Sequence, residues 1–146
     1  MTGNADTVVF ALPGNETLAA TLATRLGAAP GTLAIRRFPD GETYLRFDTP
    51  VDGCKVVLTC TLHQPDTNIM PLLFAASTAR ELGATRVGLV TPYLGYMRQD
   101  KRFQDGEAIT SAVFAQLLSH HIDWLVTVDP HLHRWKSLDE IYSVSS

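Results

Sequence analysis

Short apolar runs alternate with longer segments of helical period along this chain, and no other feature limits its possible folds as strongly. Strand-like runs lie at residues 8–12, 55–59, 86–90 and 123–128, and helix-like segments lie at 15–26, 66–82 and 109–121. Strands that alternate with helices in this way form a mainly parallel sheet with helices on its faces. We therefore predict an α/β fold of three layers, in which helices flank a mainly parallel sheet.

Residues 32–47 depart from this alternation and have the pattern of two short strands. Side chains alternate from Leu33 to Arg37 and again from Thr43 to Phe47, with Asp40-Gly41 between them. Asp-Gly between two alternating runs favours a tight turn that joins antiparallel strands. We predict a β-hairpin near residues 32–47.

The length and charge of the chain exclude several classes of protein. Its 146 residues, with a formal net charge of -3, correspond to one ordinary globular domain. They are too few for a (β/α)₈ barrel, which takes about 250 residues. The mildly acidic balance lacks the basic stripe of nucleic-acid-binding domains, so we predict no nucleic-acid partner. No apolar run reaches the roughly 18 residues that cross a bilayer, so we predict no membrane partner.

The beginning of the chain and its cysteines indicate a compartment. Residues 1–6 lack the positively charged region of a secretory signal. Cys54 and Cys60 match no metal-binding spacing, which favours free thiols in a reducing environment. We therefore expect a cytoplasmic location.

An irregular stretch, residues 92–107, follows the third predicted strand. Ligands of open α/β sheets bind beyond the carboxyl ends of the strands, and loops of this length are commonly functional. The stretch contains three cations, Arg98, Lys101 and Arg102. Arginine holds phosphate oxygens with two parallel hydrogen bonds and lysine adds a point charge, so these residues favour an anionic ligand. A solvated loop, in which Asp100 and Asp105 pair with these cations, is the alternative interpretation.

The last predicted strand is followed directly by Asp129, Pro130 and His131. A carboxylate and an imidazole can together hold a divalent cation, and a cation that bridges phosphate oxygens is the usual partner of an Arg/Lys phosphate site. The alternative for each histidine taken singly is that it is a structural or solvent-exposed residue and not a metal ligand.

The turn of the predicted hairpin, residues 38–42, allows two interpretations. Turn chemistry alone explains its Pro-Asp-Gly sequence. A nucleotide-binding role would use the aromatic face of Phe38 for a base, and the carboxylates of Asp40 and Glu42 for the exocyclic amine of that base. Neither standard nucleotide fingerprint, GxxxxGK[ST] or GxGxxG, occurs in the chain.

Three segments occur together in an order that resembles a known family. They are F-P-D-G-E at 38–42, P-Y-L-G-Y-M-R-Q-D-K-R at 92–102 and T-V-D-P-H at 127–131. They resemble the ribose-phosphate pyrophosphokinases, or phosphoribosyl-pyrophosphate synthetases, whose patterns are F-S-D-G-E, P-Y-x-x-Y-x-R-Q-D and a strand that ends in D-L-H. The spacing agrees along the whole chain, although Pro130 stands where the family mostly has leucine.

The resemblance implies a transferase of nucleotide biosynthesis with a phosphoribosyltransferase-like fold. Such a ribose-phosphate diphosphokinase transfers the β,γ-diphosphoryl group of ATP to the 1-hydroxyl of ribose 5-phosphate, with Mg²⁺. ATP and ribose 5-phosphate are therefore the implied partners. Two similar α/β domains form one subunit in this family, with the active site between them.

The resemblance also assigns roles at the adenine end of ATP. Phe38 would stack on adenine, and Asp40 and Glu42 would meet its polar edge. In the family this hairpin typically reaches a site on a neighbouring subunit, so the resemblance implies a homodimer or a larger homo-oligomer.

At the phosphate end the resemblance assigns catalytic, ATP-binding and metal-binding residues. Arg98 and Gln99 would contact the ATP phosphates with Asp100 close by, while Lys101 and Arg102 would join Arg98 near the transferring group in a mobile loop. His131, with Asp129, would hold Mg²⁺.

The match covers only the amino-terminal half of the family. No Asp-Asp followed by Thr-Gly-Gly-Thr, the acidic loop that binds ribose 5-phosphate, occurs in the chain. We therefore expect residues 1–146 to be a single amino-terminal, ATP-side domain that lacks the family's carboxy-terminal domain and is inactive alone. One alternative is a non-catalytic regulatory subunit of the same fold. Another is a phosphoribosyltransferase, which would need the missing acidic loop.

Overall fold

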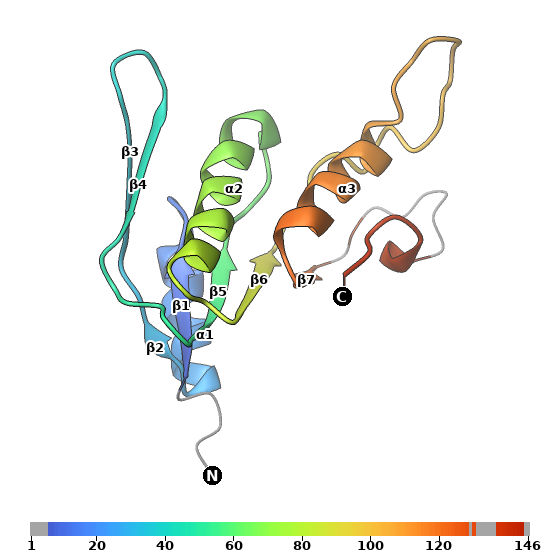
Figure 1. The fold of residues 1–146 in the computed structure, drawn as a ribbon. Helices are drawn as coiled ribbons and strands as arrows, with labels where there is room; N and C mark the ends of the chain where they lie inside the picture. Colours follow the sequence, from blue (N-terminus) through green and yellow to red (C-terminus); the bar gives the residue numbers. More distant parts are fainter. Residues whose placement is uncertain (1–5, 129, 131–136, 145–146) are drawn as a thin grey trace.

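The computed structural model describes residues 6–128, 130 and 137–144 (Figure 1). In chain order the elements are β1 (Thr7–Ala11), α1 (Glu16–Leu26), β2 (Ala29–Pro30), β3 (Leu33–Arg37), β4 (Thr43–Phe47), β5 (Lys55–Thr59), α2 (Pro65–Glu81), β6 (Arg86–Thr91), α3 (Thr110–His121), β7 (Trp124–Thr127) and the short 3₁₀ helix η1 (Leu138–Glu140). Within this described part, no helix is both long and apolar enough to cross a membrane.

Five strands form one sheet in the order β2-β1-β5-β6-β7, and every neighbouring pair is parallel. Parallel neighbours need a crossover connection, and helices α2 and α3 supply it between β5 and β6 and between β6 and β7. All carboxyl ends consequently lie at one edge of the sheet. The loops that follow β5 and β6 are therefore neighbours at this edge, where β7 also ends.

Helices cover both faces of the sheet. Val9 and Val57 pack with Ala19 and Ala23 of α1 on one face. The alternate residues of the same strands form the larger core on the other face, together with α2 and α3: Val8, Phe10, Val56, Leu58, Leu72, Ala76, Phe114 and Leu118. The predicted three-layer α/β fold, with a mainly parallel sheet flanked by helices, is confirmed.

The predicted hairpin is also confirmed, as a separate two-stranded sheet. β3 and β4 pair antiparallel from Leu33–Phe47 to Arg37–Thr43. The tip is closed by the Phe38 amide, which donates to the Glu42 carbonyl at 2.8 Å, and Gly41 takes the positive φ of 95° that the turn requires. Figure 1 shows the hairpin beside α2, projecting beyond the edge of the sheet.

Two local features differ from the sequence-based expectation. Helix α2 begins at Pro65, before the expected caps Asp66 and Thr67, and has no side-chain cap. Proline suits the first helical position because its φ is preset and its missing N–H has no helical partner there. The short strand β2 was not predicted, because its two residues, Ala29 and Pro30, have no apolar periodicity.

Asp123 connects β6, β7 and α2. Its Oδ2 accepts hydrogen bonds from the Val87 amide at 2.8 Å and from Arg80 Nη1 at 3.1 Å. Burial raises the pKa of Asp123, whereas the Val87 amide and the Arg80 guanidinium lower it, and together these effects hold it below its ordinary value. The ionised carboxylate therefore stabilises the fold.

We expect Asp123→Asn to lower the free energy of unfolding at pH 7 by about 0.5–1 kcal/mol, as for other partly exposed charged pairs. Because the pKa is depressed in the folded chain, the stabilisation is complete above the unfolded value of about 3.9 and is lost as the pH falls through the folded value. Urea unfolding should show the two chains converging at acidic pH. Asp6→Asn is the control, since Asp6 forms an exposed pair with Lys55 at 3.9 Å. A constant difference down to about pH 2 would contradict the assignment.

Candidate functional site

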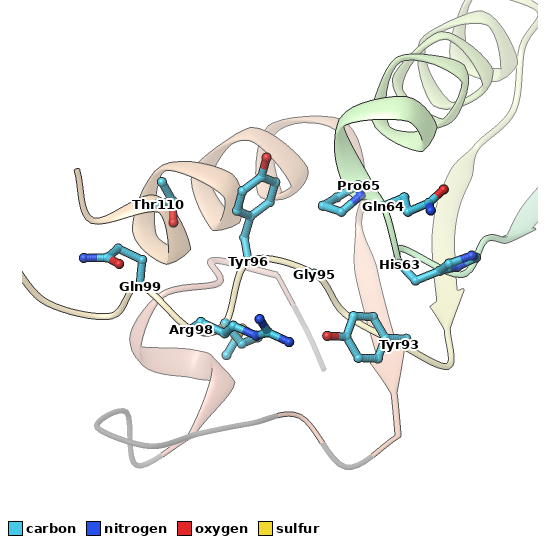
Figure 2. Close-up of a pocket in the computed structure, with 10 residues that line it drawn as sticks. His63, Gln64, Pro65, Tyr93, Gly95, Tyr96, Arg98, Gln99 and Thr110 are labelled. Atoms are coloured by element: carbon cyan, nitrogen blue, oxygen red, sulfur yellow. The ribbon is translucent and has the colours of Figure 1, made fainter. Parts of the chain in front are cut away.

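A cavity of about 360 Å³ lies beyond the carboxyl ends of β5 and β6 (Figure 2). One wall comes from the segment between β5 and α2, and the other comes from the segment between β6 and α3. The lining residues are His63, Gln64, Pro65, Tyr93, Gly95, Tyr96, Met97, Arg98, Gln99 and Thr110. The middle motif of the sequence therefore forms most of this cavity.

The amino-terminal ends of two helices meet at the cavity. Pro65 is the first residue of α2 and Thr110 is the first residue of α3, and both line the cavity wall. Each helix places the positive end of its dipole at its amino terminus, which favours negative charge nearby. The cavity is thus electrostatically suited to an anion.

The backbone around the cavity is held in unusual conformations. In the described part of the chain, the two non-glycine residues with positive φ are Gln64 (50°) and Tyr96 (59°), and both line the cavity. Such conformations persist where the surroundings enforce them, and they cluster at functional sites. The Tyr96 hydroxyl donates to the carboxylate of Asp66, and its ring packs on Phe114 with centroids 4.9 Å apart. These contacts fix Tyr96 at the cavity.

Gly95 allows the two walls to approach each other. A Cβ atom at this position would lie 2.7 Å from the Leu62 carbonyl oxygen and 3.1 Å from the Pro65 side chain. A distance of 2.7 Å is shorter than van der Waals contact, so the backbone would have to shift. The close packing of the two walls therefore explains why a glycine stands between the two tyrosines of the motif.

The cations of the loop are available to a ligand. Within the described part of the chain, Arg98, Lys101 and Arg102 form no ion pair, and all three are exposed. The Lys101 ammonium lies 5.1 Å from the centre of the Phe103 ring. In Figure 2 the Arg98 side chain extends beside Tyr93 at the cavity. The alternative of a loop neutralised by its own acids therefore does not describe these three residues.

Gln99 contributes to the framework of the loop, and its neighbour Asp100 is buried. The side-chain Nε2 of Gln99 donates to the Lys101 carbonyl at 2.9 Å, and the backbone carbonyl of Gln99 accepts from the Ser111 amide at 3.2 Å. Figure 2 shows the Gln99 side chain pointing away from Arg98. Asp100 is 5% exposed and does not line the cavity. Their contacts with ATP stay predictions.

Glu107 is an organising residue that the sequence analysis did not single out. Its Oε1 accepts hydrogen bonds from the amides of Phe103 and Gln104, both at 2.9 Å, and from Gln99 Nε2 at 3.4 Å. A carboxylate shortly before a helix was the available signal, but its partners lie in an irregular loop. Only the folded loop brings these donors together.

The hairpin residues lie elsewhere. Phe38 is 41% exposed at the hairpin tip, with its ring edge-on to Tyr44 at 5.9 Å. The Asp40 carboxylate accepts from the Glu42 amide at 3.1 Å. In Figure 1 the hairpin and the loop that carries Arg98 lie on opposite sides of α2. Within one chain, the structure does not bring Phe38, Asp40 and Glu42 to the cavity.

The predicted metal ligands Asp129 and His131 lie outside the described residues. Thr127, the last residue of β7, pairs with Thr91 of β6, so the chain leaves β7 at the edge where the cavity lies. Among the residues that the structure describes, no three histidine, cysteine or acidic side chains are grouped to hold a metal ion. The Mg²⁺ site stays a prediction.

Comparison with known proteins gives a consistent result. A family profile, described as the N-terminal domain of ribose phosphate pyrophosphokinase, matches residues 7–121. The chain is 41% identical over 118 residues to the ribose-phosphate pyrophosphokinase of Methanobrevibacter smithii, covering 80% of this chain and 40% of that protein. It is 37% identical to the protein of the same name from Methanothermobacter thermautotrophicus, covering 85% and 44%. The chain thus spans less than half the length of these relatives.

The fold is similar to that of a solved structure. The crystal structure of phosphoribosylpyrophosphate synthetase from Mycobacterium smegmatis matches with a TM-score of 0.84 at 27% sequence identity. The match covers 96% of this chain and 47% of that one. The likeness therefore extends over nearly all of the present chain and about half of the larger protein.

We expect Glu107→Ala to loosen the loop, because three hydrogen bonds to one carboxylate oxygen are lost. Trypsin cleavage at Lys101 and Arg102 should accelerate roughly fivefold, which corresponds to about 1 kcal/mol of easier local opening. Limited proteolysis followed by mass spectrometry measures this rate. Glu81→Ala, an exposed glutamate at the end of α2, is the matched control. Equal cleavage rates in the native chain and Glu107→Ala would show that Glu107 does not hold the loop.

Proposed function

Because the chain belongs to the ribose phosphate pyrophosphokinase family, we propose that it is the ATP-side domain of a ribose-phosphate diphosphokinase. The proposed reaction transfers the diphosphate of ATP to ribose 5-phosphate, yielding phosphoribosyl pyrophosphate and AMP. The observation that carries the proposal is the position of Arg98, which lies at a cavity where two helices begin and forms no ion pair with any described residue. Guanidinium groups and helix amino termini together suit a polyphosphate.

The proposed chemistry needs positioned charge more than it needs covalent help from the protein. The 1-hydroxyl oxygen of ribose 5-phosphate bonds to the β-phosphorus of ATP, the bond from that phosphorus to the α,β-bridging oxygen breaks, and the hydroxyl proton is released. Negative charge develops on the leaving AMP and on the oxygens of the transferring group. Arg98, with Lys101 and Arg102 in the same loop, would stabilise this charge without reorganisation of solvent.

Mg²⁺ belongs to the proposal through the family resemblance. Asp129 and His131, which follow β7, are the residues we propose to hold it. When bound, the ion would neutralise charge on the ATP phosphates.

We further propose that a complete site uses more than one copy of this chain. The hairpin lies on the far side of α2 from the loop between β6 and α3 (Figure 1), and Phe38, Asp40 and Glu42 do not line the cavity. This arrangement supports a hairpin that serves the site of a neighbouring copy. Ribose 5-phosphate would be held by a carboxy-terminal half like that of the longer relatives. The 146-residue chain alone would then bind ATP and be catalytically inactive.

A cytoplasmic location stays part of the proposal, in keeping with the free thiols of Cys54 and Cys60. The alternative of a non-catalytic regulatory subunit is less well supported. Lys101 and Arg102 are exposed and unpaired within the described residues, as a catalytic loop would require.

We expect Arg98→Ala to weaken ATP binding by at least about tenfold, because it removes a charged hydrogen-bonding partner of the phosphates. Isothermal titration calorimetry with Mg²⁺ and ATP measures this change. Arg25→Ala, which removes the same charge from α1 on the opposite face of the sheet, should leave the affinity unchanged.

The native 146-residue chain, incubated with ATP and ribose 5-phosphate, should form no phosphoribosyl pyrophosphate. Formation at a rate comparable to that of complete enzymes would disprove the inactivity of the isolated domain. Unchanged ATP affinity in Arg98→Ala would disprove the assignment of the phosphate site.

A further inference from the structure

Helix α2 contains a proline in its interior, and this proline leaves one carbonyl without its usual partner. Pro71 has no N–H, so it cannot donate to the carbonyl of Thr67, four residues earlier. Despite this, the helix continues to Glu81 with Pro71 fully within it. The Thr67 carbonyl is therefore open to a donor from outside the helix.

Arg37, the last residue of β3, supplies that donor. Its Nη2 donates to the Thr67 carbonyl at 3.0 Å, and its Nη1 donates to the Gly41 carbonyl at 3.1 Å. The planar guanidinium thus joins the turn of the hairpin to the interrupted helix with two hydrogen bonds. A lysine could not form this pair with the same geometry, because its ammonium is a single point donor.

The two bonds span a region that lacks close packing. A cavity of about 420 Å³ lies between the hairpin tip and α2, and its lining includes Arg37, Glu42, Asp66 and Met70. Lower on the hairpin, the contact between Phe10 and Phe47, with centroids 4.9 Å apart, anchors the base to the sheet. At the tip, the hydrogen bonds of Arg37 anchor the hairpin to α2.

The tip that Arg37 anchors carries the residues assigned to adenine. Phe38 follows Arg37 directly, and Gly41, whose carbonyl Arg37 binds, lies between Asp40 and Glu42. The Gly41 amide in turn donates to the Phe38 carbonyl at 2.8 Å. A shift of Arg37 would therefore move the ring and both carboxylates together.

We propose that Arg37 is a positioning residue that uses the carbonyl freed by Pro71 to hold the adenine-binding tip in a fixed orientation, and that it thereby sets the preference for adenine over guanine nucleotides. This inference rests on the proposed function for the role of the tip. The two hydrogen bonds of Arg37 do not depend on that function. Preorganised tips lose less conformational entropy on binding. Polar groups held at fixed positions also reject a base whose donors and acceptors do not match them.

The first experiment measures how strongly Arg37 holds the hairpin tip when no ligand is present. Hydrogen exchange of the Phe38 and Gly41 amides should be roughly tenfold faster in Arg37→Ala, the change expected when a charged hydrogen bond is lost. Arg37→Lys should resemble Arg37→Ala, because charge without the planar fork does not bridge two carbonyls. Arg46→Ala is the control, since Arg46 lies on β4 and pairs with Asp48 at 2.6 Å. Exchange at the tip that is unchanged in Arg37→Ala, or equally fast in Arg46→Ala, would overturn the proposal.

A second measurement tests the role of Pro71. In Pro71→Ala the helix regains an N–H for the Thr67 carbonyl, so this carbonyl gains a donor besides Arg37. Arg37→Ala should then lower the Tm by less in the Pro71→Ala background than in the native chain. An equal decrease in both backgrounds would show that the freed carbonyl is not what Arg37 serves.

The third measurement concerns selectivity. The ratio of ATP to GTP affinity, measured by calorimetry on the full chain, should fall roughly tenfold in Arg37→Ala and stay unchanged in Arg46→Ala. A native chain that binds ATP and GTP equally would disprove the proposed adenine role of the tip. The hydrogen-exchange data would still test whether Arg37 anchors the tip to α2. A native chain that prefers ATP, with the same preference in Arg37→Ala, would disprove the positioning role of Arg37.

Discussion

Parallel pairing of the central strands is the constraint on which the rest of this molecule depends. Because β5, β6 and β7 run in one direction, their carboxyl ends lie at one edge, and the segments that follow β5 and β6 meet there. The connections then return as α2 and α3, whose amino termini necessarily begin at that same edge. The cavity, the two helix dipoles and the cationic loop are therefore consequences of one sheet topology. Gly95 completes the arrangement, since its missing side chain lets the two walls approach.

The electrostatics of the loop depend on the contacts that its acidic side chains make. The chain has a formal net charge of -3, yet Arg98, Lys101 and Arg102 stay unpaired within the described residues. Glu107 directs its carboxylate to two backbone amides and to the Gln99 amide, so it organises the loop without neutralising a guanidinium. Asp100 is buried. A low net charge thus coexists with a local concentration of positive charge, which suits a small polyphosphate, whereas an extended nucleic acid requires a basic stripe over a larger surface.

The hairpin is a second structural unit that is attached to the α/β body at two levels. Aromatic packing of Phe47 on Phe10 holds its base, and the Arg37 guanidinium holds its tip to the helix that Pro71 interrupts. Each attachment follows from a different physical effect, apolar burial in the first case and an orphaned carbonyl in the second. The hairpin and the loop between β6 and α3 lie on opposite sides of α2 (Figure 1), so the two motifs of one chain lie apart.

Local pattern in the sequence determined the elements of this protein and the chemistry of its motifs. The range Lys55–Thr59 and the hairpin around Asp40-Gly41 were predictable, because apolar periodicity and turn residues act between near neighbours. The cationic character of the segment around Arg98 was equally visible. Only the tertiary structure decided that His63 and Gln64 share a cavity with Arg98, that Glu107 organises the loop, and that Arg37 compensates for Pro71. These relations join residues brought together by strand order and by the course of an irregular loop. No periodicity encodes such distances, because they arise from packing between elements and not within them.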